Sequence, residues 1–502
     1  MSDFNEPMDR FLIGFGKADI KLVVPPSSAA AMDSALATNP HLTSLPLPKP
    51  DRLCPAGLSQ TTGTAEILRF PEVQAAITGD FIVLPCDLVS EMGGEALVES
   101  WMIQNAGLGG VTGSSDAIGD DIGMGGVRSG RRGGLGVWYE TKGVEAIKGQ
   151  ETDFVATTPC ATKFSSASDS LLPRISNLVY SMPTDTMRDI TEEKKSFPIR
   201  HALIRKHAHI KMLTTHRDAH IYLFPYWVME MAERNERFDS ISEDLVGWWA
   251  KARWQDGLGE KLGLQYIFDP SEVSKDGDHM LQSGLLEDEI NLARMSSTWT
   301  TASTRRTQKS HTDSPMFASR VVGNDLADQS TTTGSLDDRK LVIPPINAYI
   351  HPSGGDAPLI RRCDTTSQLL TISLQLAKLQ AQEGADAPAL VHPFAHRTKI
   401  AHPEGVASRS TVTAHDCLLA ENVVVEEKCV IKESVIGAGC RIGKSARLTR
   451  CLLMDGVIIG DRAQLSGCVV GRRSVVGQEA TLRDCEIQDG YAVPERSRSC
   501  RG

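Results

Sequence analysis

The feature of this sequence that most constrains its fold is an aliphatic repeat in the C-terminal part of the chain. Leu419, Ile436, Leu453, Val470 and Ile487 are each 17 residues apart, and further aliphatic residues fill the intervals in steps of six, six and five. A helix repeats roughly every 3.6 residues and a strand every two, so neither produces this period. A small or β-branched residue also lies two positions before each aliphatic. The pattern predicts a three-sided solenoid in which every coil contributes three short strands.

Glycines and cysteines follow the same register. Glycine comes directly after the inward aliphatic in Ile442-Gly443 and Val476-Gly477, where we expect a corner to use its freedom in φ. Cysteine occupies small inward positions at Cys417, Cys429, Cys440, Cys451, Cys468 and Cys485. No CxxC pair occurs, so we interpret these cysteines as reduced, buried residues rather than metal ligands or disulfides. A cytosolic compartment is therefore expected.

Length and charge exclude several classes of protein. The 502 residues suffice for two or three domains with a sizeable core. The net charge of −10 argues against direct nucleic-acid binding, which needs clustered Lys and Arg. We expect no membrane partner, because no window offers about 18 uninterrupted apolar residues. The first residues, MSDFNEPMDR, do not form a secretory signal.

Upstream of the repeat, short apolar runs alternate with helical patterns and predict an α/β domain. A strand is expected at 20–24, a helix at 29–38 and a fully buried strand at 81–84. Such a strand is typical of a parallel sheet, whose ligands bind beyond the carboxyl ends of the strands. Asp87 follows it and is the first candidate site residue.

Two segments of low complexity, 107–135 and 273–340, are expected to be inserts. Further strands are expected at 137–139, 153–157, 178–184, 202–214 and 219–228. The segment 365–382 predicts an amphipathic helix, capped by Thr365 or Thr366, that connects the α/β domain to the solenoid.

Histidines and tryptophans stand out between 201 and 256. Metal is one interpretation of His201, His207, His209, His216 and His220. Because His207 and His209 alternate with Ala208 and Ile210, the solvent face of a strand explains them better. The segment 239–256 predicts a helix capped by Ser242 or Asp239, with Leu245, Trp248, Trp249 and Trp254 as buried anchors.

An α/β domain followed by this solenoid resembles the sugar-phosphate nucleotidyltransferases, whose solenoid is a left-handed β-helix of hexapeptide repeats. The segment Gly63-Thr64-Ala65 is similar to the one with which such enzymes approach a nucleotide base. Asp87 lies where they carry a magnesium-binding carboxylate. A helix start with Glu66 as a first-turn acid explains Thr64 equally well. For Asp87 the alternative is a strand-end carboxylate that accepts backbone N–H bonds. The resemblance implies that Glu243 and Asp244 are a substrate-binding pair, and first-turn acids of a helix explain them equally well.

Several longer strings resemble the gamma-subunit family of eukaryotic translation initiation factor 2B. They are TGTAEILR, DFIVLPCDLV, LGVWYETKG, ETDFVATTP, SISEDLVGWWAKARWQDGL and IPPINAYIHPS. The resemblance implies a non-catalytic subunit of the complex that exchanges GDP for GTP on initiation factor 2, in which gamma pairs with the catalytic epsilon subunit and the other subunits. No cofactor is required. Gly63, Thr64 and Asp87 would form a vestigial nucleotide site, with GTP as its ligand.

Two departures from the nucleotidyltransferases predict an inactive site. Nothing before Arg10 supplies their first strand and glycine-rich loop, and Cys86 replaces the glycine before the aspartate. We therefore expect an N-terminally incomplete nucleotidyltransferase-like domain over 1–350. It is followed by a linker over 351–395, a left-handed β-helix over 396–494 and a tail over 495–502.

Two alternative activities remain. A mannose-1-phosphate guanylyltransferase is the first. The second is an acyltransferase with a histidine base, for which the candidates are His392, His396, His402 and His415.

Overall fold

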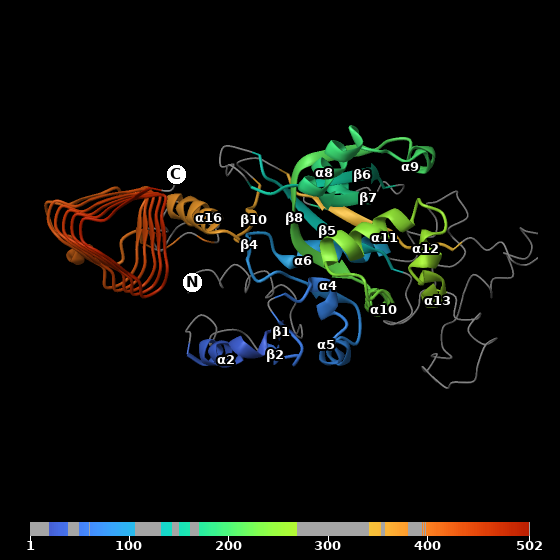
Figure 1. Cartoon of the computed structure of the whole chain (residues 1–502), viewed down its shortest axis with the longest axis horizontal. Helices are drawn as coiled ribbons and strands as arrows, with labels where there is room; N and C mark the ends of the chain where they lie inside the picture. The colour runs from blue at the N-terminus through green and yellow to red at the C-terminus, as the bar shows by residue number, and fades with distance from the viewer. Residues whose placement is uncertain are drawn as a thin grey trace, which may run out of the picture.

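The computed structural model in Figure 1 contains two bodies joined by helix α16 (Thr366–Lys378). It describes residues 20–38, 50–59, 61–105, 132–142, 150–160, 170–268, 341–352, 357–379, 394, 396 and 398–500. The start of the chain and the predicted insert at 273–340 lie outside these residues. For the other predicted insert, 107–135, the predicted C-terminal boundary is wrong, because strand β5 already begins at Gly134.

A six-stranded sheet forms the centre of the α/β body, in the order β3-β8-β5-β9-β7-β6. Its strands are β3 (Phe81–Val83), β5 (Gly134–Glu140), β6 (Asp153–Pro159), β7 (Ile175–Pro183), β8 (Lys211–Phe224) and β9 (Ile346–Ile350). Only β5 and β9 run parallel. The expectation of a parallel, fully buried strand at 81–84 is therefore wrong. β3 is a half-buried edge strand antiparallel to β8, and an apolar run alone does not specify the direction of its partner.

Helices cover both faces of this sheet. The alternating side chains of β5 show this, because they point to opposite faces and each packs against different helices. Trp138 packs in a buried cluster with helices α10 (Trp227–Arg234) and α11 (Gly247–Ala252). Tyr139 packs in a second cluster with α6 (Gly94–Asn105). The predicted α/β class is thus what the structure contains, and its nucleotidyltransferase-like character stays a prediction.

Smaller elements surround the sheet. The strands β1 (Lys21–Val23) and β2 (Asp51–Leu53) form a separate parallel pair, which confirms the strand expected at 20–24. The other helices of this body are η1 (Pro26–Ser28), α2 (Ala29–Thr38), α4 (Thr64–Ile67), α5 (Pro71–Ala76), η3 (Leu172–Arg174), α8 (Thr184–Lys194), α9 (His201–Lys206), α12 (Leu258–Lys261) and α13 (Leu264–Phe268), while η6 (Pro403–Gly405) lies at the start of the β-helix. No helix among the described residues has the length and apolar character needed to cross a bilayer.

The strand expected at 202–214 is wrong over its first half. Residues 201–206 form α9, which buries Leu203 against Trp254. His207 caps that helix and His209 precedes β8, so the two histidines do not alternate along a strand. The burial of one leucine against a distant tryptophan decides the local structure here.

The helix expected at 239–256 consists of η4 (Ile241–Val246) followed by α11. Its cap is Ser240, whose Oγ accepts a hydrogen bond from the Glu243 backbone N–H, rather than Ser242 or Asp239. Three of the four predicted anchors are buried. Trp248 is not, since it is 38% exposed beside Lys251.

The C-terminal body is a three-sided β-helix. The first sheet contains β11 (Thr411–Val412), β14 (Val430–Lys432), β17 (Arg447–Thr449), β20 (Gln464–Ser466), β23 (Thr481–Arg483) and β26 (Arg498–Cys500). The second contains β12 (Leu418–Leu419), β15 (Val435–Ile436), β18 (Leu452–Leu453), β21 (Val469–Val470) and β24 (Glu486–Ile487). The third contains β13 (Val424–Val425), β16 (Arg441–Ile442), β19 (Ile458–Ile459), β22 (Val475–Val476) and β25 (Ala492–Val493). All pairings are parallel, and Ile436 pairs with Leu453, 17 residues later, which confirms the predicted coil.

The glycines after the inward aliphatics were expected to adopt positive φ angles at corners, but the structure gives another reason for them. A Cβ on Gly443 would lie 2.6 Å from the Asp461 carboxylate and 2.8 Å from its backbone nitrogen, in the next coil. These glycines are needed because adjacent coils approach closely. The positive φ angles occur at other corner positions, including Lys428 (61°), Ser445 (58°) and Arg462 (56°).

The β-helix cysteines match their interpretation as small apolar residues. They are free, and all but Cys485 are buried among the inward aliphatics. Cys485 is only partly buried because it lies in the last coils of the stack.

Helix α16 packs against both bodies. Its N-terminus carries a capping box in which Thr365 and Gln368 satisfy each other's backbone N–H groups. Leu370 packs against Leu452 of the β-helix, and Ile372 packs against Val89 of β4 (Leu88–Ser90). The predicted connector therefore has an apolar contact on each side.

We expect Gly443→Ala to lower the free energy of unfolding by about 1–3 kcal/mol, because the added methyl group overpacks the contact between coils. Ser445→Gly, at a positive-φ corner two residues away, is the control and should change it by less than about 1 kcal/mol. Denaturant unfolding followed by circular dichroism measures both. Equal stability of Gly443→Ala and the parent protein would contradict the assignment.

Candidate functional site

The predicted residues Gly63 and Thr64 begin helix α4 and dock it against residues 239–241. The Thr64 hydroxyl accepts a hydrogen bond from the Ile241 backbone N–H at 2.9 Å, and the Ala65 N–H donates to the Asp239 carbonyl at 2.9 Å. A Cβ on Gly63 would collide with Asp239. Thr64 begins the helix and Glu66 lies in its first turn, but the N-cap is Gly63 and the Thr64 hydroxyl makes a tertiary contact instead of capping the helix. A nucleotide contact stays a prediction.

The acids at the start of η4 also make local contacts. The Asp244 carboxylate accepts backbone N–H bonds from Asp239 at 2.9 Å and from Ser240 at 3.1 Å. Glu243 and Asp244 therefore have the first-turn position that was one of their two interpretations. None of the described contacts joins this region to Asp87.

Asp87 lies just before β4 and forms an ion pair with Arg362. Arg362 ends β10 (Ile360–Arg362), which pairs antiparallel with β4 and so places the two side chains together. The guanidinium Nη2 lies 3.0 Å from Asp87 Oδ2, and Nε lies 3.2 Å from the same oxygen. The Asp87 carboxylate thus accepts from a guanidinium rather than from the backbone N–H groups of the alternative interpretation.

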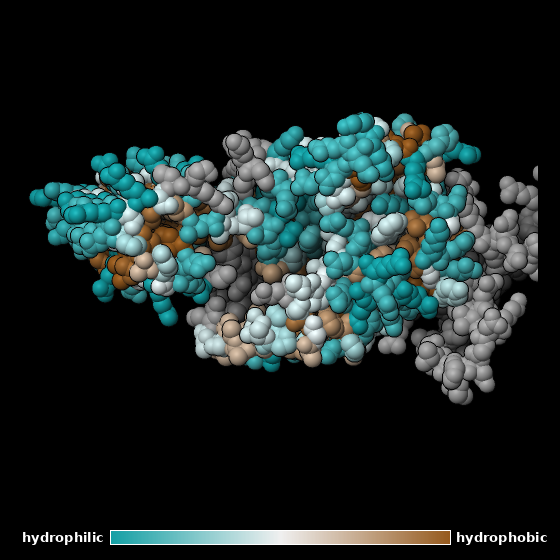
Figure 2. Space-filling view, viewed as in Figure 1, coloured by the Kyte–Doolittle hydropathy of each residue, from teal (hydrophilic) through white to brown (hydrophobic). Residues whose placement is uncertain are grey.

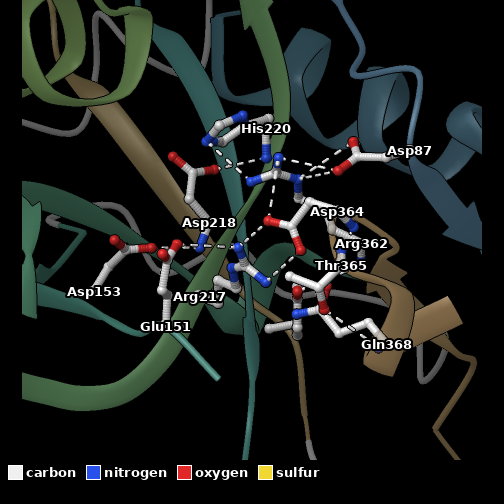
Figure 3. Close-up of polar contacts among 11 residues, drawn as sticks. Asp87, Glu151, Asp153, Arg217, Asp218, His220, Arg362, Asp364, Thr365 and Gln368 are labelled. Carbon is white, nitrogen blue, oxygen red and sulfur yellow. Dashed lines mark hydrogen bonds and ion pairs between the residues drawn. The ribbon is translucent and has the colours of Figure 1, made fainter. Parts of the chain in front are cut away.

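Arg362 is one of two arginines in a buried charge network (Figure 3). The second is Arg217 of β8, whose side chain is only 6% exposed. Both Nη atoms of Arg217 donate to Asp364, with Nη1 at 3.2 Å from Oδ1. Arg217 also lies 3.4 Å from Glu151, and Arg362 lies 3.9 Å from Asp364. Asp364 is therefore shared by two guanidinium groups.

A second group of polar residues lies beside the arginines on β8. The register of β5 against β8 shifts between Gly136 and Trp138, and this bulge holds His220 at a φ of 53°. The His220 N–H donates to Asp218 at 2.8 Å, and the Tyr222 hydroxyl donates to the same carboxylate. The His220 Nε2 lies 3.4 Å from Arg362 Nη1.

Burial shifts the pKa values of Asp153, Asp218 and His220. It raises the pKa of Asp153 to about 7, with a further contribution from Asp218, and raises the pKa of Asp218 to about 6. Burial, with the nearby Arg362, lowers the pKa of His220 to about 4. His220 is therefore neutral at pH 7, and its ring nitrogen can accept a hydrogen bond from Arg362.

The sequence contains two further signals that point to this network. The pair Arg217-Asp218 interrupts an apolar strand, and a charged pair inside such a run needs a partner. Arg362 and Asp364 surround Cys363 directly before the predicted helix cap. Neither signal identifies which charges meet, because the partners are far apart in sequence.

The network holds the chain leading into α16 against the α/β body.

Among the described residues, no group of three or more His, Cys, Asp or Glu side chains is arranged to hold a metal ion. The acyltransferase candidates His402 and His415 contact only adjacent acids, Glu404 at 3.0 Å and Asp416 at 3.4 Å. His392 lies outside the described residues.

We expect Arg217→Met to lower the free energy of unfolding by about 1.5–3 kcal/mol, because it removes the charged hydrogen bonds that Asp364 accepts from its closest cation. Arg188→Met is the matched control. Arg188 pairs with Asp185 on the surface, where such pairs contribute about 0–1 kcal/mol. Denaturant titration of both variants tests the prediction, and equal losses would contradict it.

We expect Asp153→Asn to become more stable relative to the parent protein as the pH rises from about 4 to about 7. The folded Asp153 holds its proton up to about pH 7, whereas an ordinary carboxyl of pKa 3.8 has lost it. The parent therefore loses this stabilisation as the pH rises, and Asn cannot ionise. Unfolding at several pH values measures the difference. Asp185→Asn, at an exposed position, is the control. The assignment would be contradicted if the stability of Asp153→Asn relative to the parent protein fell as the pH rises.

The comparisons with known proteins concern the β-helix first. A family model described as the EIF2B subunit epsilon LbH domain matches residues 398–497, where LbH denotes the left-handed β-helix. The chain is also similar to the translation initiation factor eIF2B subunit gamma of Schizosaccharomyces pombe (strain 972 / ATCC 24843), at 27% identity over 97 residues. That match covers 19% of this chain and spans only 20% of the relative. The first match shows a domain of the eIF2B left-handed β-helix type, and both matches support a relation to the eIF2B family.

Proposed function

We propose that this chain is a non-catalytic, gamma-type subunit of an eIF2B complex that exchanges GDP for GTP on translation initiation factor 2. The observation that carries the proposal is the eIF2B-type β-helix, matched over 398–497. The similarity to a gamma subunit and the gamma-type strings in the α/β body favour gamma over epsilon. In this role the chain pairs with the epsilon subunit in the cytosol and supports it.

The outer surfaces of the β-helix support a role in assembly. On the second sheet the outward residues Leu452 and Val469 are buried beneath α16. On the third sheet the neighbouring outward residues Ile458 and Val475 are 43% and 40% exposed and form a short apolar row, which the exposed Arg441 separates from Val424. We assign a partner subunit to this apolar row.

The condition of Asp87 supports a subunit without nucleotidyl transfer. That reaction needs a carboxylate free to hold a divalent cation against the triphosphate. Here the carboxylate is paired with Arg362, whose guanidinium would have to move away to release it. The proposal therefore treats Asp87 as part of the junction between the two bodies.

We expect the full chain to co-purify with an epsilon-type subunit and to raise the rate at which that subunit releases GDP from initiation factor 2. Ile458→Glu should weaken the co-purification, because it places a charge in the apolar row. Gln464→Glu, on the exposed first sheet, is the matched control. Native mass spectrometry and fluorescent GDP release provide the measurements.

Two outcomes would overturn the proposal. The first is a chain that recovers no epsilon-type partner. The second is release of pyrophosphate by the chain alone from GTP and mannose 1-phosphate, which would instead support the nucleotidyltransferase alternative.

A further inference from the structure

A strongly basic surface lies on the α/β body, away from the charge network. It comprises α9 and the residues on either side of it, from Lys194 to Met212. Its cations are Lys194, Lys195, Arg200, Arg205, Lys206 and Lys211, and no Asp or Glu occurs within these limits. The whole chain has a net charge of −10, so this is a local reversal of sign.

Apolar side chains are exposed among these cations. Helix α9 buries Leu203 in the cluster that contains Trp254, which leaves the opposite side of the helix in solvent. Ile204 is 54% exposed, and the flanking Ile199 and Met212 are 43% and 42% exposed. Figure 2 shows brown atoms beside teal ones in the region of α9. Monomeric surfaces seldom combine exposed aliphatics with unpaired charge unless a partner covers them.

The basic surface is held rigidly to α11. The Lys206 ammonium donates to the Arg253 carbonyl just beyond that helix. On α11 itself, the Lys251 ammonium lies 4.6 Å from the centre of the Tyr180 ring and 4.8 Å from that of the half-exposed Trp248. A rigid surface loses little conformational entropy on binding.

Glu192 and Glu193 directly precede Lys194, but four cations further along the segment form no ion pair in the described part of the chain. None of the ion pairs among the described residues includes Lys195, Arg200, Arg205 or Lys211. Burial lowers the pKa of Lys251, and the neighbouring Arg200 adds to this effect. The surface is therefore electrostatically complementary to an anion.

We infer that this basic surface binds an acidic segment of a partner protein that also carries apolar side chains. The carboxylates of the segment pair with Arg200 and Arg205. Its apolar side chains cover Ile199, Ile204 and Met212.

The composition of the surface favours a protein segment over RNA. Single-stranded RNA is held by stacking of its bases on aromatic side chains as well as by cations. The large apolar side chains exposed among these cations are Ile199, Ile204 and Met212, and Phe197 is partly buried in the α/β core, which leaves His201 and His209 as the exposed rings of the segment. The negative net charge of the whole chain also repels an extended polyanion, whereas a short acidic segment interacts mainly with the local cations.

The test uses the full chain and a fluorescein-labelled peptide of 12 residues with six Glu and three Leu, measured by fluorescence anisotropy. We expect the parent protein to bind it. The double variant Arg200→Glu, Arg205→Glu should bind at least about tenfold more weakly, because two attractive charges become repulsive. Ile204→Ser alone should weaken binding severalfold. Replacement of the three Leu by Ser in the peptide should have a similar effect on the parent protein.

The matched control is Arg447→Glu, Arg483→Glu, which makes the same change of charge on the first sheet of the β-helix, where both arginines are exposed. Its affinity should equal that of the parent, and circular dichroism verifies that all variants are folded. Three results would overturn the inference. They are failure of the parent to bind the peptide, equal weakening by the two double variants, and tighter binding of a 12-nucleotide single-stranded RNA than of the peptide.

Discussion

The arrangement of the two bodies depends on one carboxylate, that of Asp364, shared between two arginines from different strands. Arg217 comes from the centre of the sheet and Arg362 from the short strand that leads into α16. The two guanidinium groups are largely buried, and a buried charge is costly unless it is paired, so both depend on this partly exposed carboxylate and its neighbours. The capping box begins at the next residue, so the direction of α16 follows from the position of Asp364. The apolar contacts of α16 then bring the β-helix to its place.

The sequence predicted the β-helix better than the α/β body, and the reason is the range of the interactions. Each coil repeats the same local pattern, so Ile436 and Leu453 indicate their pairing by their spacing alone. In the α/β body β3 pairs with β8, which comes much later in the chain, and no local pattern reveals that direction. The helix at 201–206 likewise depends on a distant tryptophan.

The candidate site shows the same division. Asp87 was identified from its position after a strand, but its partner Arg362 becomes a neighbour only through the pairing of β10 with β4. Gly63 and Thr64 were identified from a motif, and their contacts with residues 239–241 come from tertiary packing. A motif can therefore indicate which residues matter to the structure. It does not show which distant residues they contact. The similarity found for the β-helix concerns a different part of the chain from these residues.

The parallel register of the β-helix also determines how this protein can change in length over evolution. Val435 pairs with Leu452, and Leu452 pairs in turn with Val469, so every coil presents the same interface to the next. A gene that gains or loses one complete coil keeps all inward residues inside. A gain or loss of a single residue shifts every later aliphatic away from the core. Length variation among its descendants should thus occur in whole coils, with smaller changes confined to the corners.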